Sequence, residues 1–265
     1  MSFYYLLHYG HSDITFQGKY QTMTLELLTY SVLLFLALFV VGVFLCLKLY
    51  KWQYTRFFHS MLWTKVYYWI PIFIIFLITL FVGLWATIAV ACTVAGLSIR
   101  ELLRQSRKDW VATLYALFIV FATTHPILFF LSFESTQSII VLLIVGFSSV
   151  LSDVCAYFFG NFLGKHKLPT WINNNKSWEG VIGQLVGAIT GFLLISPALQ
   201  PAPHFVLAVL IGVASATGDI FNSIVKRRIS IKDWGMTIPG HGGVLDRFAS
   251  LSLAIAIAYW WTMLT

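Results

Sequence analysis

One helical face inside a long apolar segment carries four polar side chains. Spacings of three, four and seven residues bring together a carboxylate, an amide, a hydroxyl and an ammonium group: Asp219, Asn222, Ser223 and Lys226. This set suits a divalent cation with phosphate groups beside it, because Mg²⁺ binds through one or two carboxylates and the oxygens of substrate phosphates. A structural hydrogen-bond network between helices is the alternative explanation.

Two further carboxylates lie within apolar segments, where an ionisable side chain is costly and by default a functional candidate. Asp153 lies near the end of one segment, and Asp246 lies in the first turn of the last one. Asp219 occupies a similar depth, so the three carboxylates can meet below the same membrane face. We therefore expect one polar pocket at that face.

The segment between the last two apolar runs is basic and rich in glycine. It contains Lys226-Arg227-Arg228, Lys232 and the run Pro239-Gly240-His241-Gly242-Gly243. Glycines allow backbone N–H groups to turn towards an anion, and the helix that starts after them directs the positive end of its dipole to the same place. Together with Asp219 and Asp246, this segment predicts a binding site for a polyphosphate.

A second basic stretch precedes another apolar segment. It holds Lys165 and Lys167, and it is followed by Asn173-Asn174-Asn175-Lys176 and by Ser177, which can cap the next helix. A lysine at a helix start suits a phosphate group. A loop that only touches lipid headgroups is the alternative.

The composition is that of a membrane protein. Hydrophobic residues make up 59% of the 265 residues and charged residues only 10%, whereas soluble domains carry about 25% charged residues. The net charge of +7 does not indicate nucleic acid, because the cations lie at the ends of apolar runs and suit anionic lipid or phosphate. The three cysteines stand at unrelated spacings inside apolar runs and fit neither disulfides nor a thiolate metal site: Cys46, Cys92 and Cys155.

Apolar runs of about 20 residues, the length that crosses a bilayer as a helix, follow one another along the chain. The run over 66–104 is divided by Gly83 into a hairpin. The run over 109–133 contains Pro126, which disturbs a helix, so it forms either one kinked span or a broken pair. The eight expected spans are 27–48, 66–83, 85–104, 109–133, 138–161, 179–197, 203–227 and 244–264.

The distribution of cations supports this count. If all eight runs cross the membrane, 16 of the 17 Lys and Arg residues fall on one side and only Lys19 falls on the other. The positive-inside rule makes the crowded side cytoplasmic, with both termini outside. We expect an integral membrane protein, with the bacterial inner membrane as its location and the polar pocket facing the cytoplasm.

Glycines distinguish the last part of the chain. Small residues such as glycine let helices pack closely. We therefore expect an all-α integral membrane protein of about eight transmembrane helices, divided into two regions. Residues 1–140 form an N-terminal transmembrane region, and residues 141–265 form a compact, glycine-rich bundle that carries the site. The glycines are Gly160, Gly164, Gly183, Gly187, Gly191, Gly212 and Gly218.

A long spaced motif runs through the basic, glycine-rich segment before the last apolar run. It reads Ser223-Ile-Val-Lys226-Arg227, then Lys232-Asp233, then Ile238-Pro239-Gly240-His241-Gly242-Gly243-Val244-Leu245-Asp246-Arg247. It resembles the signature of the phosphatidate cytidylyltransferase (CDP-diacylglycerol synthase) family. The resemblance extends back through Lys176-Ser177-Trp178-Glu179-Gly180 and covers roughly residues 145–255.

The resemblance implies a reaction in which CTP and phosphatidate, or a related lipid phosphate, give CDP-diacylglycerol and pyrophosphate. It also implies that the reaction needs Mg²⁺, and it leaves open whether a second cation takes part. It likewise leaves open whether the chain forms a homodimer. The implied metal ligands are Asp219 and Asp246, and the implied catalytic residues are Lys226, Lys232, His241 and Arg247. The implied substrate-binding residues are Asp153, Tyr157, Lys165, Lys176, Asn222, Ser223, Gly242 and Gly243.

Five positions depart from the family pattern. Ala249 stands where the family has a carboxylate, Asn173-Asn174-Asn175 replaces Ser-Pro-Gly, and Trp234 replaces a small residue. These departures fit a divergent paralogue with a changed lipid preference or a catalytically weakened membrane scaffold. A CTP-dependent lipid kinase, in which a lipid hydroxyl attacks the γ-phosphorus, is another alternative. A transporter is disfavoured, because the sequence shows no internal repeat.

Overall fold

The structure, a computed structural model, describes residues 13–105, 109–173, 175–199, 203–238 and 242–265. Within these ranges the chain is helical, and its extended segments form only isolated bridges. The elements are α2 (Asp13–Leu49), α3 (Tyr54–Phe58), α4 (Met61–Phe81), α5 (Leu84–Leu103), α6 (Trp110–Ala122), α7 (His125–Ser132), α8 (Ser135–Phe162), α9 (Trp178–Ile195), η1 (Ser196–Ala198), α10 (Phe205–Arg228) and α11 (Val244–Leu264).

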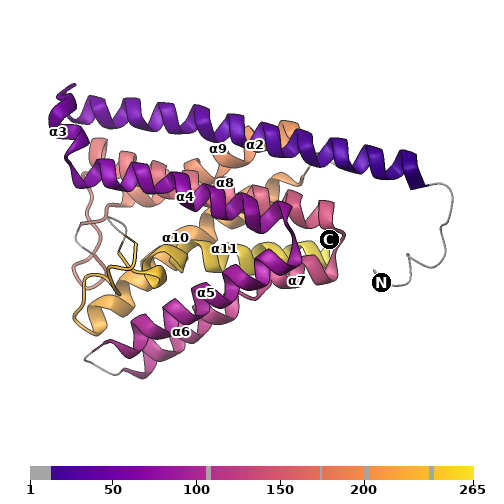
Figure 1. The fold of residues 1–265 in the computed structure, drawn as a ribbon. Helices are drawn as coiled ribbons and strands as arrows, with labels where there is room; N and C mark the ends of the chain where they lie inside the picture. Colours follow the sequence, from indigo (N-terminus) through magenta and orange to yellow (C-terminus); the bar gives the residue numbers. More distant parts are fainter. Residues whose placement is uncertain (1–12, 106–108, 174, 200–202, 239–241) are drawn as a thin grey trace.

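The described part of the chain contains eight helical segments long and apolar enough to cross a membrane. They alternate in direction, so the C-terminal ends of α5, α8 and α10 lie at the end of the molecule where α3 lies (Figure 1). The prediction of an all-α integral membrane protein with eight spans is confirmed. The segments are Thr22–Leu49, Met61–Phe81, Leu84–Leu103, Trp110–Ser132, Ser135–Phe162, Trp178–Ala198, Phe205–Arg228 and Val244–Leu264.

Both uncertain runs have a clear outcome. Gly83 has φ +87°, a conformation that glycine adopts without strain, and it forms the predicted turn between α4 and α5. The other run is one interrupted span: α6 ends at Ala122 and α7 begins at His125 and continues along the same path (Figure 1). Pro126 lies in the first turn of α7, where its missing N–H costs no hydrogen bond.

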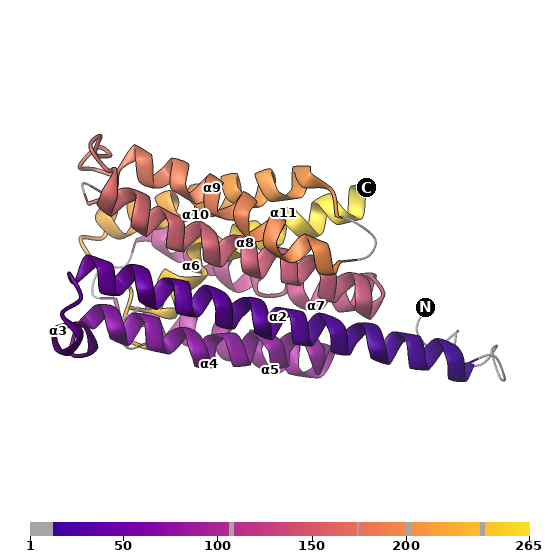
Figure 2. The same ribbon diagram turned by 90° about the horizontal axis from the view of Figure 1, so that it is seen from above.

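Helix α8 forms the centre of the bundle. A continuous stretch from Ser138 to Ser149 is buried, and α8 contacts α4, α7, α9, α10 and α11 (Figure 2). A helix that is apolar all round belongs in such an interior position. The outer α2 and α4, by contrast, leave nearly all of their apolar side chains partly or fully exposed, as helices in contact with lipid do.

Glycines bring α9 against α8. A Cβ atom on Gly187 would overlap the backbone carbonyl of Leu151, and one on Gly191 would overlap that of Phe147. The two helices therefore pack with their backbones in near contact, which is how small residues stabilise helix pairs in membranes. This packing fixes the end of α9 that carries the loop before it, and with it one side of the polar pocket.

The close approach of α8 and α9 makes a stability prediction. Gly187→Ala should lower the free energy of unfolding in detergent by about 1–3 kcal/mol, because the added methyl group forces two packed backbones apart. Gly96→Ala on α5 is the matched control, since a Cβ there meets nothing within 4 Å. Equal stability of the two variants in thermal or denaturant unfolding would contradict this description of the interface.

Candidate active site

Asp219 lies on α10 and forms an ion pair with a lysine that precedes α9. Lys176 Nζ lies 2.5 Å from Asp219 Oδ2 and 3.2 Å from the Asp219 carbonyl oxygen. Gln184 on α9 also donates to Oδ2, at 3.2 Å, whereas no described residue donates to Oδ1. The side chains of Lys176 and Asp219 are 26% and 31% exposed. A ligand from the aqueous side can therefore reach this pair.

The loop before α9 is folded so that it presents Lys176. The Lys167 and Ser177 positions form an antiparallel bridge, and Leu168 N donates to the carbonyl oxygen of Lys176 at 2.9 Å. Ser177 Oγ accepts a hydrogen bond from Gly180 N, so the predicted N-cap of α9 is confirmed. The cap and the bridge together fix the backbone on both sides of Lys176.

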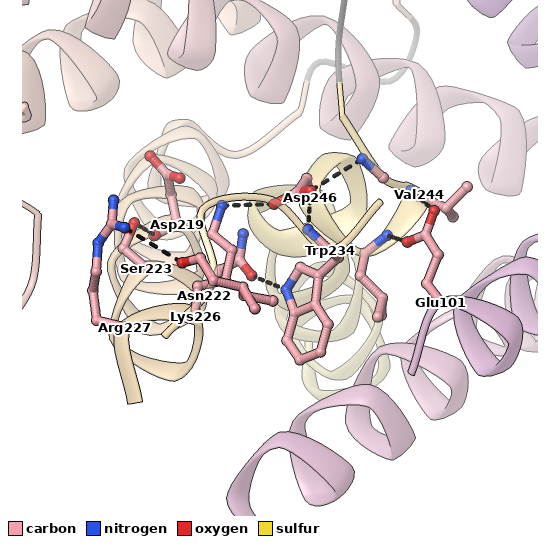
Figure 3. Close-up of polar contacts among 12 residues, drawn as sticks. Glu101, Asp219, Asn222, Ser223, Lys226, Arg227, Trp234, Val244 and Asp246 are labelled. Carbon is pink, nitrogen blue, oxygen red and sulfur yellow. Dashed lines mark hydrogen bonds and ion pairs between the residues drawn. The ribbon is translucent and has the colours of Figure 1, made fainter. Parts of the chain in front are cut away.

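Asp246 forms a second, more deeply buried ion pair (Figure 3). Lys226 Nζ donates to Asp246 Oδ1 at 2.6 Å, while Trp234 N and Gly243 N donate to Oδ2 at 2.8 and 3.0 Å. The side chain of Asp246 is 2% exposed and that of Lys226 is 14% exposed. Asp246 therefore joins α10, the loop and the start of α11 through three donors.

Trp234, one of the departures from the family pattern, is a buried part of this arrangement. Its Nε1 donates to Asn222 Oδ1 at 2.8 Å, and its ring stacks on Tyr115 with centroids 5.8 Å apart. Ser223 Oγ donates to the carbonyl oxygen of Asp219, within α10 itself. Asn222 and Ser223 thus belong to the predicted polar face, but in this structure they hold Trp234 and the helix backbone.

At the start of α11, backbone N–H groups that could face an anion are bound by carboxylates of the chain itself. The N–H groups of Val244 and Leu245 donate to Glu101, at 2.8 and 3.0 Å, and that of Gly243 donates to Asp246 (Figure 3). Carboxylates of the chain itself already occupy the positive end of this helix dipole. The sequence did not lead us to name Glu101 as a site residue, because its only local signal is a charged side chain within an apolar segment.

Asp153 completes the group of carboxylates. Ser250 Oγ on α11 lies 3.2 Å from Asp153 Oδ1, and the charges of Asp219, Arg247 and Lys176 act on the Asp153 carboxylate. The carboxylates of Asp153 on α8 and Asp219 on α10 therefore lie near enough to interact electrostatically, whereas Asp246, the third predicted carboxylate, is bound by its own donors. Tyr157, one turn further along α8, is half-exposed and lies near Cys46 and Tyr50 at the end of α2.

The remaining predicted cations surround this pocket loosely. Lys165 and Lys232 are exposed on loops, and Arg247 is exposed on the first turn of α11. Lys65 of α4 lies near the same cations, because the charges of Arg247 and Lys232 act on it. Gly242 has φ +83° and allows the turn before α11. The predicted catalytic residue His241 lies outside the described residues.

Ala249, where the family pattern has a carboxylate, is buried at the crossing of α10 and α11. A Cβ on Gly218 would overlap the Ala249 carbonyl, so the two helices are in near contact there. With Tyr115 and Phe221, these two residues line an apolar pocket of about 230 Å³. The departure at position 249 therefore lies in an apolar wall.

Comparison with known proteins decides the family. A sequence model of the cytidylyltransferase family matches residues 18–264. The chain belongs to the cytidylyltransferase family. This confirms the resemblance and extends it from roughly residues 145–255 to most of the chain.

Curated members of this family show the same relation over shorter segments. The chain is 45% identical over 112 residues to the phosphatidate cytidylyltransferase of Brucella melitensis, a match that covers 41% of each protein. It is 43% identical over 119 residues to that of Mycobacterium leprae, covering 44% of this chain and 38% of the relative. The matched segments thus span about two fifths of the curated relatives.

In this member of the cytidylyltransferase family, the ion pairs Lys226–Asp246 and Arg228–Asp109 differ in burial, so their removal should change the free energy of unfolding by different amounts. Lys226→Met leaves the buried Asp246 charge without its cation and should lower the free energy of unfolding by about 3–5 kcal/mol.

The control is Arg228→Met on the same helix, which removes the exposed ion pair with Asp109. Partial desolvation raises the pKa of Asp109, but hydrogen bonds from Arg228, Ala112 and Val111 outweigh it and leave the pKa below its usual range. This exposed pair should contribute little. A control variant as unstable as Lys226→Met in denaturant unfolding would overturn the distinction.

Proposed function

We propose that the protein transfers the cytidylyl group of CTP to a lipid phosphate, in the first place phosphatidate. The products would be CDP-diacylglycerol and pyrophosphate. The observation that carries the proposal is the accessible Lys176–Asp219 pair, which lies beside Asp153 at the end of the bundle where the basic loops gather. Membership of the cytidylyltransferase family and the names of the curated relatives support the same reaction.

The chemistry requires little from the protein beyond positioning and charge. An oxygen of the lipid phosphate attacks the α-phosphorus of CTP, and the bond from that phosphorus to the bridging oxygen of the β-phosphate breaks. A phosphate oxygen is already ionised near neutral pH, so no strong general base is needed. Lys176 and Lys226 would hold phosphate oxygens as negative charge moves to pyrophosphate. Lys232, Arg247 and His241 complete the proposed set of cationic and hydrogen-bonding groups.

We propose that Asp219 would hold Mg²⁺ together with substrate phosphate oxygens, since among the described residues no group of three or more His, Cys, Asp or Glu side chains is arranged to hold the ion by itself. The Asp219 carboxylate is partly exposed, and among the described residues none donates to Oδ1. Asp246 accepts three hydrogen bonds, so as a ligand it would first have to give up its bond to Lys226. Asp153 is a third carboxylate within electrostatic reach of Asp219. Bound Mg²⁺ would neutralise phosphate oxygens and favour departure of pyrophosphate.

The remaining substrate contacts follow from position. Lys165, Tyr157, Asn222, Ser223, Gly242 and Gly243 are proposed to line or support the substrate site within the bundle of residues 141–265. The basic end of the molecule would face the cytoplasm of a bacterial inner membrane, where CTP enters from water. The lipid would reach the pocket sideways between helices, with its phosphate at the depth of Asp153 and Asp219.

Labelled CTP tests the reaction directly. Purified protein, phosphatidate, Mg²⁺ and CTP labelled at the α-phosphorus should give a labelled lipid, whereas γ-labelled CTP should release its label as pyrophosphate. In cytidylyl transfer, the α-phosphorus is the only phosphorus atom of CTP that reaches the lipid. Transfer of the γ label to lipid would show a lipid kinase instead, and no transfer of either label to any phospholipid would contradict the proposal.

Carboxylate variants test the site. Asp219→Asn and Asp246→Asn should each lower turnover of CTP by about 100-fold or more, since each removes a charge that organises the phosphates. Asp109→Asn, which alters a carboxylate paired with Arg228 at the same end of the molecule, should keep turnover near that of the unaltered protein. Unchanged turnover in Asp219→Asn protein that retains its fold would remove Asp219 from the proposed site.

A further inference from the structure

Helix α5 belongs to the first half of the chain, yet it holds the segment that precedes α11. Glu101 is 3% exposed, and it accepts hydrogen bonds from one group of that segment and from two backbone groups in the first turn of α11. Thr237 Oγ1 lies 2.5 Å and Val244 N 2.8 Å from Oε1, and Leu245 N lies 3.0 Å from Oε2. One buried side chain thus joins both described ends of the segment that carries Gly242.

The glycines of this segment make room for Glu101. A Cβ on Gly243 would lie 2.5–2.9 Å from the carboxylate atoms of Glu101, and one on Gly235 would lie 3.1–3.3 Å from the end of the same side chain. A Cβ on Gly243 at such distances would force the end of the Glu101 side chain to move away from its hydrogen-bond donors. Gly243 therefore has a structural reason for lacking a side chain that is independent of any nucleotide.

A second side chain, just after the end of α5, extends the contact. Gln105 lies one turn after Glu101, and its Nε2 donates to the carbonyl oxygen of Trp234 at 2.8 Å. Trp234 N in turn donates to Asp246 Oδ2, and Asp246 lies directly after Leu245, whose N–H Glu101 holds. The two backbone groups that donate to Asp246 Oδ2, Trp234 N and Gly243 N, therefore lie next to backbone groups that Gln105 and Glu101 bind.

We propose that Glu101 is a positioning residue of this site, which sets the backbone of residues 243–246 and thereby the direction of the Asp246 carboxylate. Glu101 touches no proposed substrate atom and acts through Asp246 and Lys226. As far as turnover is concerned, the inference rests on the proposed cytidylyl transfer. Its structural part, the clamp on the start of α11, can be measured without any reaction.

Glu101→Gln is the first test. The amide keeps the shape of the side chain, but its NH₂ group cannot accept a hydrogen bond and opposes at least one of the three donors. Hydrogen exchange at the amides of Val244 and Leu245 should become about tenfold faster. The kcat for cytidylyl transfer, per folded molecule and below the unfolding temperature, should fall by about 10- to 100-fold, while KM for CTP changes much less.

Glu134→Gln is the matched control. Glu134 precedes α8, its side chain makes no capping hydrogen bond, and it is exposed. This variant should keep both the exchange rates and kcat. If Glu101→Gln leaves amide exchange at Val244 and Leu245 unchanged, the clamp is refuted. If exchange accelerates and the melting temperature falls but kcat stays the same, Glu101 only stabilises the fold, and the positioning role is refuted.

A double-mutant cycle tests the contact with Gly243. Gly243→Ala should lower kcat and accelerate the same amide exchange, because its methyl group collides with the Glu101 carboxylate. In the Glu101→Asp background, where the carboxylate is withdrawn by one methylene, Gly243→Ala should have a clearly smaller further effect. Gly96→Ala on α5 has open space and should show no such dependence. Additive effects would refute the proposal that Gly243 makes room for Glu101.

These readouts separate the two proposals. If the unaltered protein transfers no label from CTP, the proposed function fails, but the exchange rates and their coupling still decide whether Glu101 clamps the start of α11. If transfer occurs and the exchange rates do not depend on Glu101, the function stands and the clamp fails.

Discussion

A carboxylate placed inside the bundle must find its hydrogen-bond donors within the protein, and Asp246 shows what this demands. Its two oxygens accept from Lys226 on α10, from Trp234 in the loop and from Gly243 at the start of its own helix. A buried charge left without such partners costs several kcal/mol, about 3–5 when one member of a buried pair is removed. The end of α10, the loop and the start of α11 are therefore held in one arrangement by a single side chain.

The two ion pairs differ in burial, and this suggests different roles. Lys226–Asp246 is nearly closed to solvent, whereas Lys176–Asp219 is partly exposed and is presented by a loop held by the bridge at Lys167. An exposed pair can exchange its partners for phosphate and metal at small cost, because water already screens it. A buried pair is better suited to hold the pocket in shape, which agrees with the contacts that surround Asp246.

The sequence predicted the spans and the turn at Gly83, because hydropathy and the position of a glycine between two apolar runs are local signals. It did not predict that Glu101 would occupy the start of α11, since that contact joins positions 143 residues apart and no local pattern announces it. It also treated Trp234 as a departure, although that residue is held by Asn222 and stacks on Tyr115. A glycine-rich loop looks the same in sequence whether its N–H groups serve a nucleotide or a carboxylate of the chain.

The central claim is that nucleotide binds at the basic end of the bundle, between Lys176 and the segment from Asp219 to Arg247. Photocrosslinking with an azido analogue of CTP in intact membranes, followed by peptide mapping, tests this directly. The account predicts adducts in peptides that contain Lys176 or residues 219–247, and unlabelled CTP should suppress them. Competable adducts confined to the opposite end of the bundle, at residues 133–138, 196–199 or 203–205, would contradict it.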